Sequence, residues 1–196
     1  MIWFPSAPTT MVALLALMLT GGAFILSVIL ARSRAPGESG GTRSRLSSGG
    51  IALQAIGMFV VGFGDTRLIA HYGPPQIAAV IAVLLCGGSA VLLFTTAKRA
   101  MGANWSLVAR TRDDHELVTS GPFAHVRHPI YTGMALFLIA LAVALGHETN
   151  LLAGLPLFVA GTMIRVVEEE RLLRAHFGAA YDVYAAQVAR FVPKLF

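Results

Sequence analysis

The chain carries an unbroken run of uncharged residues at positions 11–30, MVALLALMLTGGAFILSVIL. A helix needs about 20 mostly apolar residues to cross the hydrocarbon core of a bilayer, so this run predicts a membrane span. Residues 76–96 and 130–145 are two further uncharged runs of the same kind. The 196-residue sequence is 56% hydrophobic and only 13% charged, which leaves too few polar side chains to cover a water-soluble domain. We therefore predict an all-α polytopic membrane protein.

Two weaker runs complete the predicted bundle. Residues 49–64 are uncharged but short and rich in glycine, which suits close packing between membrane helices. Residues 151–167 are apolar apart from Arg165 and follow the previous run after a short polar turn, which predicts a tight antiparallel hairpin. We expect five spans, or four if residues 49–64 only re-enter the membrane. A secretory signal peptide is the alternative for the first run, although nothing basic precedes it.

The net charge of +5 is unevenly distributed along the chain. Most Lys and Arg residues follow the first, third and fifth predicted spans, whereas the opposite loops hold only Arg67. By the positive-inside rule the N-terminus is then outside and the C-terminus is cytoplasmic. In this arrangement the basic residues serve as topology signals and contacts to membrane lipids, and we expect no nucleic-acid partner.

The chain divides into two predicted parts. Residues 1–100 hold the first three spans and a segment at 31–48 that is rich in Gly, Ser and Arg and lacks hydrophobic periodicity. That composition predicts a mobile cytoplasmic loop at 31–48. Residues 101–196 hold a cytoplasmic loop, the helical hairpin and a C-terminal helix.

A first polar cluster precedes the fourth predicted span, in GPFAHVRHPIYTG at residues 121–133. Pro129 has a fixed φ and fits the first turn of a helix, so the span should begin there. Arg127 and His128 then lie at a helix N-terminus, where exposed backbone N–H groups favour an anionic ligand group.

A second polar cluster continues the fifth span as a helix towards a stop near Gly178. Arg165 shares a face of this helix with Glu168 and Glu169. The hairpin brings the start of the fourth span beside the end of the fifth, so the two clusters should converge. At most two of the three consecutive carboxylates, residues 168–170, can serve one site.

Both clusters also have structural interpretations. Arg127 and His128 could only anchor lipid phosphates, and Arg165 with Glu169 could be only an intrahelical ion pair. A metal or haem site at the histidines is a further alternative, but no cluster has a recognised metal-ligand spacing. The sequence has no phosphate-binding glycine loop, Rossmann fingerprint or Gly-x-Ser-x-Gly elbow, which excludes soluble nucleotide-binding architectures. A proton or ion channel lacks ionisable residues within the first four spans.

The two clusters together resemble the isoprenylcysteine carboxyl methyltransferase family and its bacterial relatives, including phospholipid methyltransferase-like proteins. The matching residues are Gly121-Pro122-Phe123, Val126 to Gly133, Glu169-Glu170, Leu173, Phe177-Gly178, Tyr181, Tyr184, Arg190-Phe191 and Pro193, with Gly102 and Asn104-Trp105-Ser106 before them. The resemblance covers roughly the C-terminal half of the chain. Phe123 departs from the pattern, because the family usually has Tyr there, which puts any hydroxyl contact at that position in doubt.

The resemblance implies an integral-membrane methyltransferase that uses S-adenosyl-L-methionine. The implied cofactor-binding residues are Leu117, Val118, Gly121, His125, Arg127, His128, Tyr131, Glu169 and Glu170. Arg127 and His128 suit the carboxylate of the cofactor, and a glutamate suits its ribose hydroxyls. The ring of Tyr131 suits the sulfonium or the adenine.

The implied substrate is lipophilic and enters from the bilayer, either as an isoprenylcysteine-type carboxylate or as a lipid amine. Arg165 and Glu168 are the predicted catalytic residues. A carboxylate or thiolate acceptor needs a cationic guide, for which we choose Arg165, and an amine acceptor needs a base, for which we choose Glu168 or His125. The expected location is a bacterial inner membrane, with the active site facing the cytoplasm. The alternative function is that of a non-catalytic membrane accessory or sensor protein that retained the fold.

Overall fold

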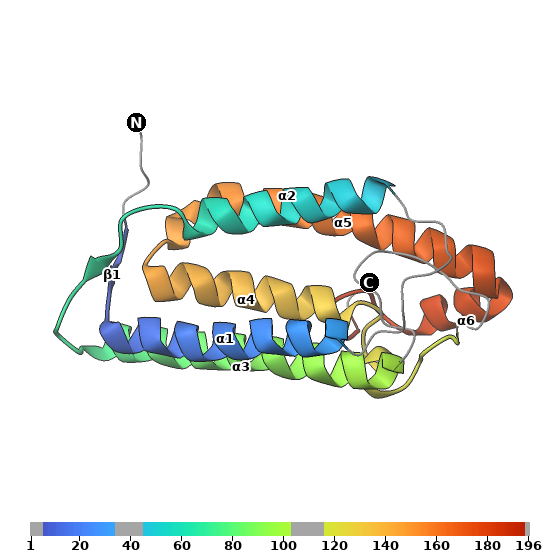
Figure 1. The fold of residues 1–196 in the computed structure, drawn as a ribbon, viewed down its shortest axis with the longest axis horizontal. Coiled ribbons are helices and arrows are strands. Elements are labelled where there is room, and N and C mark those ends of the chain that lie inside the picture. The colour runs from blue at the N-terminus through green and yellow to red at the C-terminus, as the bar shows by residue number, and fades with distance from the viewer. Residues whose placement is uncertain (1–5, 34–44, 103–115, 195–196) are drawn as a thin grey trace.

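The computed structural model describes residues 6–33, 45–102 and 116–194. Figure 1 shows long helices that lie side by side along the long axis of the molecule. These helices are α1 (Met11–Ser33), α2 (Arg45–Gly62), α3 (Pro74–Met101), α4 (Pro129–Leu145) and α5 (Leu151–Phe177). The shorter elements are β1 (Pro8–Thr9), β2 (Arg67–Leu68), η2 (Gly121–Ala124), η3 (Glu148–Asn150) and α6 (Ala179–Gln187). The predicted helical class is confirmed, and the two-residue strands form one short parallel pair.

Helix α4 is the central element, between the pair α2/α5 and the pair α1/α3 (Figure 1). On one side its Leu138 and Ala142 pack with Val61 of α2 and Phe158 of α5. On the other side its Ala144 joins a buried cluster with residues of α1 and α3. Within α4, Ile139 is the one large hydrophobic side chain that is exposed. The remaining long helices each expose several large apolar side chains, as expected for surfaces that face lipid.

Helices α2 and α5 approach each other through reciprocal glycines. A Cβ built on Gly57 would lie 2.7 Å from the carbonyl oxygen of Gly154, and one built on Gly161 would lie 2.6 Å from that of Gly50. Neither distance leaves room for a side chain, so the glycines set the separation of the two helices. The close packing predicted for the glycine-rich run is therefore confirmed.

The membrane character of the fold follows from three of these helices. α1, α3 and α5 are long and apolar enough to cross a bilayer, while α2 and α4 are shorter apolar helices. At 1.5 Å per residue the 18 residues of α2 and the 17 of α4 are about 25–27 Å long, slightly less than the hydrocarbon core. Five crossings therefore remain a prediction, as does the orientation of the bundle.

The predicted loop at residues 31–48 was too long at both ends. Helix α1 continues to Ser33 and α2 already begins at Arg45, and residues 34–44 lie outside the described part of the chain. The polar stretch that opens α2 carries no hydrophobic periodicity, and its helical state follows from its continuity with the apolar turns that pack on α5.

The hairpin of α4 and α5 is also only partly as predicted. Its turn is short and the two helices run in opposite directions (Figure 1). Their main packing partners differ, however, because α5 lies along α2 and α4 lies along α3. The start of α4 and the later part of α5 still meet, and that end of the pair holds the polar clusters.

The opposite end of the bundle holds a separate buried polar group. His147 places Nδ1 3.1 Å from the Val61 carbonyl oxygen, and Asn150 Nδ2 donates to the Phe63 carbonyl oxygen at 2.9 Å. Both acceptors lie at the C-terminal end of α2, where helix carbonyls lack partners within the helix. Gly146 ends α4 in the left-handed conformation at φ 71°, and the Ala7 backbone N–H donates to its carbonyl. These bonds hold the α4–α5 turn against the end of α2 and the N-terminal segment against the end of α4.

Candidate functional site

The start of α4 is held by the C-terminal segment of the chain. His128 is the N-cap of α4 and Pro129 is its first residue, as predicted. The backbone N–H of His128 donates to the Arg190 carbonyl at 3.0 Å, and Thr132 Oγ1 donates to the Phe191 carbonyl at 3.0 Å. Segments about 60 residues apart thus fix the orientation of the helix N-terminus.

The two polar clusters meet at this point, which confirms their predicted convergence. The Tyr131 hydroxyl donates to Glu169, and His128 Nδ1 lies 3.7 Å from the same carboxylate. His128 Nε2 lies 3.2 Å from Glu170 Oε1, and an ionised carboxylate can only accept, so Nε2 carries the proton of this bond. The His128 and Tyr131 rings lie 5.8 Å apart, and both side chains are buried.

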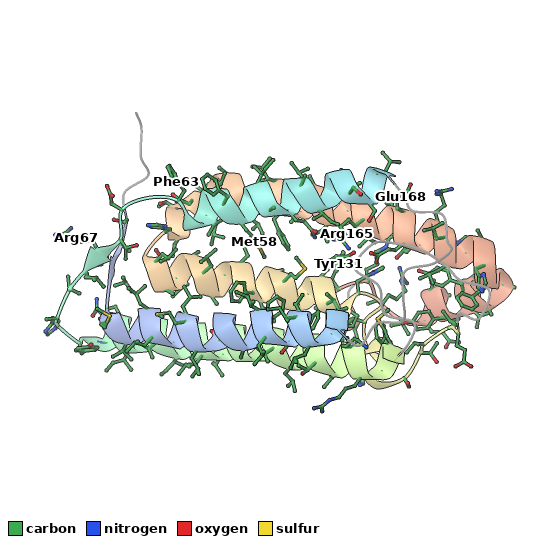
Figure 2. The ribbon with its side chains drawn as sticks, viewed as in Figure 1. Met58, Phe63, Arg67, Tyr131, Arg165 and Glu168 are labelled. Carbon is green, nitrogen blue, oxygen red and sulfur yellow. The ribbon has the colours of Figure 1, made fainter. Side chains whose placement is uncertain are left out.

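Arg165 faces the same cluster from α5. Its guanidinium lies 3.7 Å from Glu169 and 5.2 Å from the centroid of the Tyr131 ring. Figure 2 shows Arg165 and Tyr131 directed towards each other between α5 and α4. The predicted ion pair with Glu169 is present, and a cation over an aromatic face is an additional favourable contact.

Gln54 of α2 is a member of this network that the sequence analysis did not include. Its side chain is buried, its Nε2 donates to Thr162 Oγ1 at 2.8 Å, and its Oε1 accepts from Arg165 Nη1 at 3.4 Å. Gln54 is the one amide within the apolar run at residues 49–64. Polar side chains in membrane helices usually have a partner, so this residue could have been predicted to contact another polar group. Gln54 therefore links α2 to the Arg165 side of the site.

Glu170 is surrounded by basic side chains. Arg190 binds it through two hydrogen bonds of 3.0 and 2.8 Å, Arg127 lies 3.3 Å away, and His128 lies at 3.2 Å. Only 4% of its side chain is exposed. A buried carboxylate with this many partners is suited to holding α4, α5 and the C-terminal segment together.

Arg127 is likewise occupied by the protein. Its Nη1 donates to the carbonyl oxygens of Ala185 and Val188, the latter at 2.6 Å, at the C-terminal end of α6. Its Nε is buried and has no hydrogen-bond partner within the described ranges. Nη1 therefore caps a helix, Nη2 faces Glu170, and Nε is a buried donor that remains.

Glu169 differs from these two residues, because 24% of its side chain is exposed. It accepts from Tyr131 and pairs with Arg165 and His128 while keeping a partly accessible face. Of the carboxylates in this cluster it is the one best placed to exchange a protein partner for a ligand hydroxyl.

Glu168 lies on a different side of α5. It pairs with Arg171 across 3.1 Å, and Figure 2 places it at the upper edge of the helix, away from the space between Arg165 and Tyr131. The sequence rule that three consecutive carboxylates cannot share one direction is confirmed by these three residues.

The other predicted cofactor residues lie in the segment before α4. Gly121 has a φ of 62° and begins η2, against the end of α3, while His125 is exposed where η2 ends. Leu117 and Val118 are half-buried in the extended stretch before them. Asn104, Trp105 and Ser106 lie outside the described residues.

Two tyrosines of the C-terminal motif lie on α6, and one of them supports η2. The Tyr184 hydroxyl donates to the Phe123 carbonyl oxygen at 2.8 Å, so this contact uses the backbone of Phe123 and needs no hydroxyl on its side chain. Burial raises the pKa of Tyr181 and of Tyr184 to about 12. Among the described residues no group of three His, Cys, Asp or Glu side chains is arranged to hold a metal ion.

Comparison with known proteins identifies the family to which this arrangement belongs. Residues 79–175 match the model of the isoprenylcysteine carboxyl methyltransferase (ICMT) family. The chain is 36% identical over 89 residues to the protein-S-isoprenylcysteine O-methyltransferase of Schizosaccharomyces pombe, covering 44% of this chain and 37% of that protein. It is 31% identical over 84 residues to protein-S-isoprenylcysteine O-methyltransferase B of Arabidopsis thaliana, covering 43% of each. The chain therefore spans about two-fifths of the length of the curated relatives it matches.

The fold resembles a solved structure of the eukaryotic intramembrane Ras methyltransferase ICMT, with a TM-score of 0.53 over 91% of this chain and 68% of that one. Sequence identity is 20%, so this likeness concerns the fold. The family match starts inside α3 and includes α4 and most of α5, with Tyr131, Arg165 and Glu169. Through these residues, 79–175, the chain belongs to the isoprenylcysteine carboxyl methyltransferase family.

Proposed function

We propose that this chain is a membrane methyltransferase that uses S-adenosyl-L-methionine and methylates the carboxylate of a lipophilic, isoprenylcysteine-type acceptor. The observation that carries the proposal is the meeting of Tyr131 and His128 with Glu169 and Arg165 inside the region of the family match. The curated relatives are protein-S-isoprenylcysteine O-methyltransferases by name, which supports the choice of a carboxylate acceptor.

The residues present suit this cofactor. Glu169 offers a partly exposed carboxylate for the ribose hydroxyls, and His128 with the N-terminus of α4 suits the amino-acid carboxylate. The face of the Tyr131 ring already holds a guanidinium at 5.2 Å, and a sulfonium requires the same chemistry. Leu117, Val118, Gly121 and His125 would border the pocket. When bound, the cofactor supplies a methyl group activated by its positively charged sulfur.

In this proposal the main role of Arg127 and Glu170 is to position the other residues of the site. Their contacts join α4, α5, α6 and the C-terminal segment, so they hold His128 and the helix N-terminus in place. Within the described ranges the buried Nε of Arg127 has no hydrogen-bond partner, and in this proposal it donates to the carboxylate of the ligand.

Arg165 is the proposed guide for the acceptor. A carboxylate nucleophile is already ionised at neutral pH and needs orientation and exclusion of water more than a base. The planar guanidinium of Arg165 can bind both oxygens of a carboxylate, and it lies where α5 leaves the apolar part of the bundle. The pairing of Glu168 with Arg171 favours this acceptor over an amine, for which Glu168 would have to be free to take a proton.

An experiment on Arg165 tests the proposal. Arg165→Lys and Arg165→Ala are compared with wild type for methyl transfer to an S-farnesylcysteine carboxylate and for binding of S-adenosylhomocysteine. We expect turnover to fall at least about tenfold in both variants, because Lys cannot reproduce a two-point contact, while cofactor affinity persists. Arg99→Lys, at the exposed end of α3, is the matched control and should retain full activity.

Three outcomes would change the assignment. Unchanged turnover in Arg165→Lys would withdraw the substrate-guiding role. Parallel loss of binding and turnover would move Arg165 into the cofactor site. Transfer to phosphatidylethanolamine instead of the carboxylate would replace the acceptor class by a lipid amine and return the role of base to Glu168 or His125.

A further inference from the structure

Helix α5 has a second polar surface, on the flank opposite the proposed transfer site. A cavity of about 480 Å³ is lined there by Val167, Glu170, Arg171, Arg174, Ala175 and Arg190. Because each helical residue turns the chain by about 100°, Val167 and Arg174 point roughly 160–180° away from Arg165. The cavity therefore lies on a different side of α5 from the space between Arg165 and Tyr131. Glu170 forms part of the wall between the two.

The hydrogen-bond donors of this cavity, rather than its net charge, suit an anion. Its three arginines pair with Glu168, Asp182 and Glu170, so the carboxylates around the cavity are each already engaged by a guanidinium. A guanidinium carries five N–H donors, and these pairs use one or two on each arginine. The side chains of Arg171 and Arg174 are 66% and 51% exposed, which leaves donors accessible to a ligand. Fork-shaped donors of this kind match the oxygens of a phosphate group.

The position of the cavity along α5 corresponds to the surface of a bilayer. Arg171 lies 20 residues after Leu151, the first residue of the helix, which is about 30 Å at 1.5 Å per residue. That length equals the thickness of a typical hydrocarbon core. Where α5 crosses from its first residue, Arg171 and Arg174 are therefore at the level of the lipid headgroups.

An apolar stripe leads from the membrane part of α5 to the cavity. Ala160, Ile164 and Val167 precede Arg171 and Arg174 at alternating spacings of four and three residues, so all five lie on one face. Ile164 is 39% exposed and Val167 is 54% exposed. An acyl chain can lie along this stripe while its headgroup reaches the arginines.

We propose that this cavity binds the phosphate of an anionic phospholipid whose acyl chains lie along Ala160, Ile164 and Val167. The methyl donor carries positively charged sulfonium and ammonium groups, which the three arginines of the cavity would repel. The cavity is therefore proposed for a different ligand. The inference does not depend on the proposed methyl transfer, since a chain that transfers no methyl group can still hold this lipid.

The test uses the full chain in a nonionic detergent, titrated with phosphatidylglycerol or with phosphatidylcholine of the same acyl chains and followed by native mass spectrometry. We expect wild type to prefer phosphatidylglycerol, and Arg171→Gln/Arg174→Gln to lose at least about tenfold in affinity for it, the effect of one charge-assisted contact. Lys98→Gln/Arg99→Gln removes the same charge at the end of α3, outside the cavity, and should remain within about twofold of wild type. Val167→Trp, which obstructs the cavity without breaking an ion pair, should weaken binding as the arginine variant does.

Equal losses in the two double variants would reduce the effect to general surface charge and overturn the proposal. So would displacement of the lipid by millimolar inorganic phosphate, which would identify a soluble phosphate compound as the ligand. Competition by S-adenosylhomocysteine would overturn it as well, because the cavity would then belong to the cofactor. Melting temperatures measured without lipid confirm that each variant is folded, and Val167→Trp provides a result even if the arginine variant does not fold.

Discussion

The two ends of the bundle bury polar side chains in different ways. At the end with the α4–α5 turn, His147 and Asn150 contact backbone carbonyl oxygens of the α2 terminus and the loop after it. At the other end, Tyr131, Glu169 and Arg165 contact one another. Side-chain bonds to helix carbonyls satisfy groups that every helix leaves open. Hydrogen bonds and ion pairs between two side chains satisfy no open backbone group of a helix.

The first end therefore holds helices together, whereas the second can exchange a protein partner for a ligand. Removing a cap exposes a fixed backbone group, whereas a partly exposed carboxylate such as Glu169 can replace one partner by a ligand. The polar end also contains fastening residues, since Arg127 and Glu170 join the C-terminal segment to α4 and α5. We therefore expect substitutions at Glu170, Glu169 and Asn150 to affect different quantities.

The largest effect is expected for Glu170→Ala. It leaves Arg127, Arg190 and His128 without their shared carboxylate, and breaking a buried ion pair from one side costs about 3–5 kcal/mol. We expect the free energy of unfolding in detergent to fall by that amount. Asp182→Ala removes the partner of an exposed arginine and is the matched control, with little expected effect on the free energy of unfolding. Equal stability of the two variants would show that Glu170 does not hold the segments together.

A smaller and different effect is expected for Glu169→Ala and His128→Ala. Each should weaken binding of S-adenosylmethionine by about 1.5–3 kcal/mol, the typical value of a hydrogen bond to a charged group. Glu169→Ala should lower the free energy of unfolding less than Glu170→Ala does, because its carboxylate is partly exposed. Calorimetric titration beside thermal unfolding separates the two quantities. Wild-type affinity in both variants would assign the cluster a structural role only.

The smallest effect is expected for Asn150→Ala at the opposite end. The variant loses the hydrogen bonds to Val60 and Phe63 and should unfold with about 1–2 kcal/mol less free energy. Its turnover and its cofactor affinity should match wild type, because the polar cluster lies at the other end of the bundle. A change in affinity without a change in stability would contradict the separation between the two ends.

The features that the sequence predicted correctly depend on local rules. The start of α4 followed from the fixed φ of Pro129, the end of α5 from Gly178, and the pairing of Arg165 with Glu169 from helical spacing. The convergence of the two clusters followed from one short turn. Each of these inferences needs only residues that are near in sequence or joined by a short connection.

The features that were missed depend on distant partners. The assignment of Arg127 and Glu170 to the ligand stays a prediction, but their contacts with Val188 and Arg190 were not foreseen, because no periodicity reveals the positions of those partners. Gln54 reaches Arg165 because glycines bring α2 against α5, and the choice of α2 as the neighbour of α5 is a tertiary feature. Helix pairing of this kind is set by side-chain fit along whole helices, which spacing within one helix does not encode.

Binding of S-adenosylhomocysteine to the purified wild-type chain tests the central claim most directly. Calorimetric titration in detergent should give saturable binding with a stoichiometry of about one cofactor per chain, because one cluster of Tyr131, His128, Arg165 and Glu169 is proposed to form the pocket. The absence of saturable heat at millimolar ligand, in protein that still unfolds cooperatively, would contradict the claim that this chain is a methyltransferase and would favour a non-catalytic protein with the same fold.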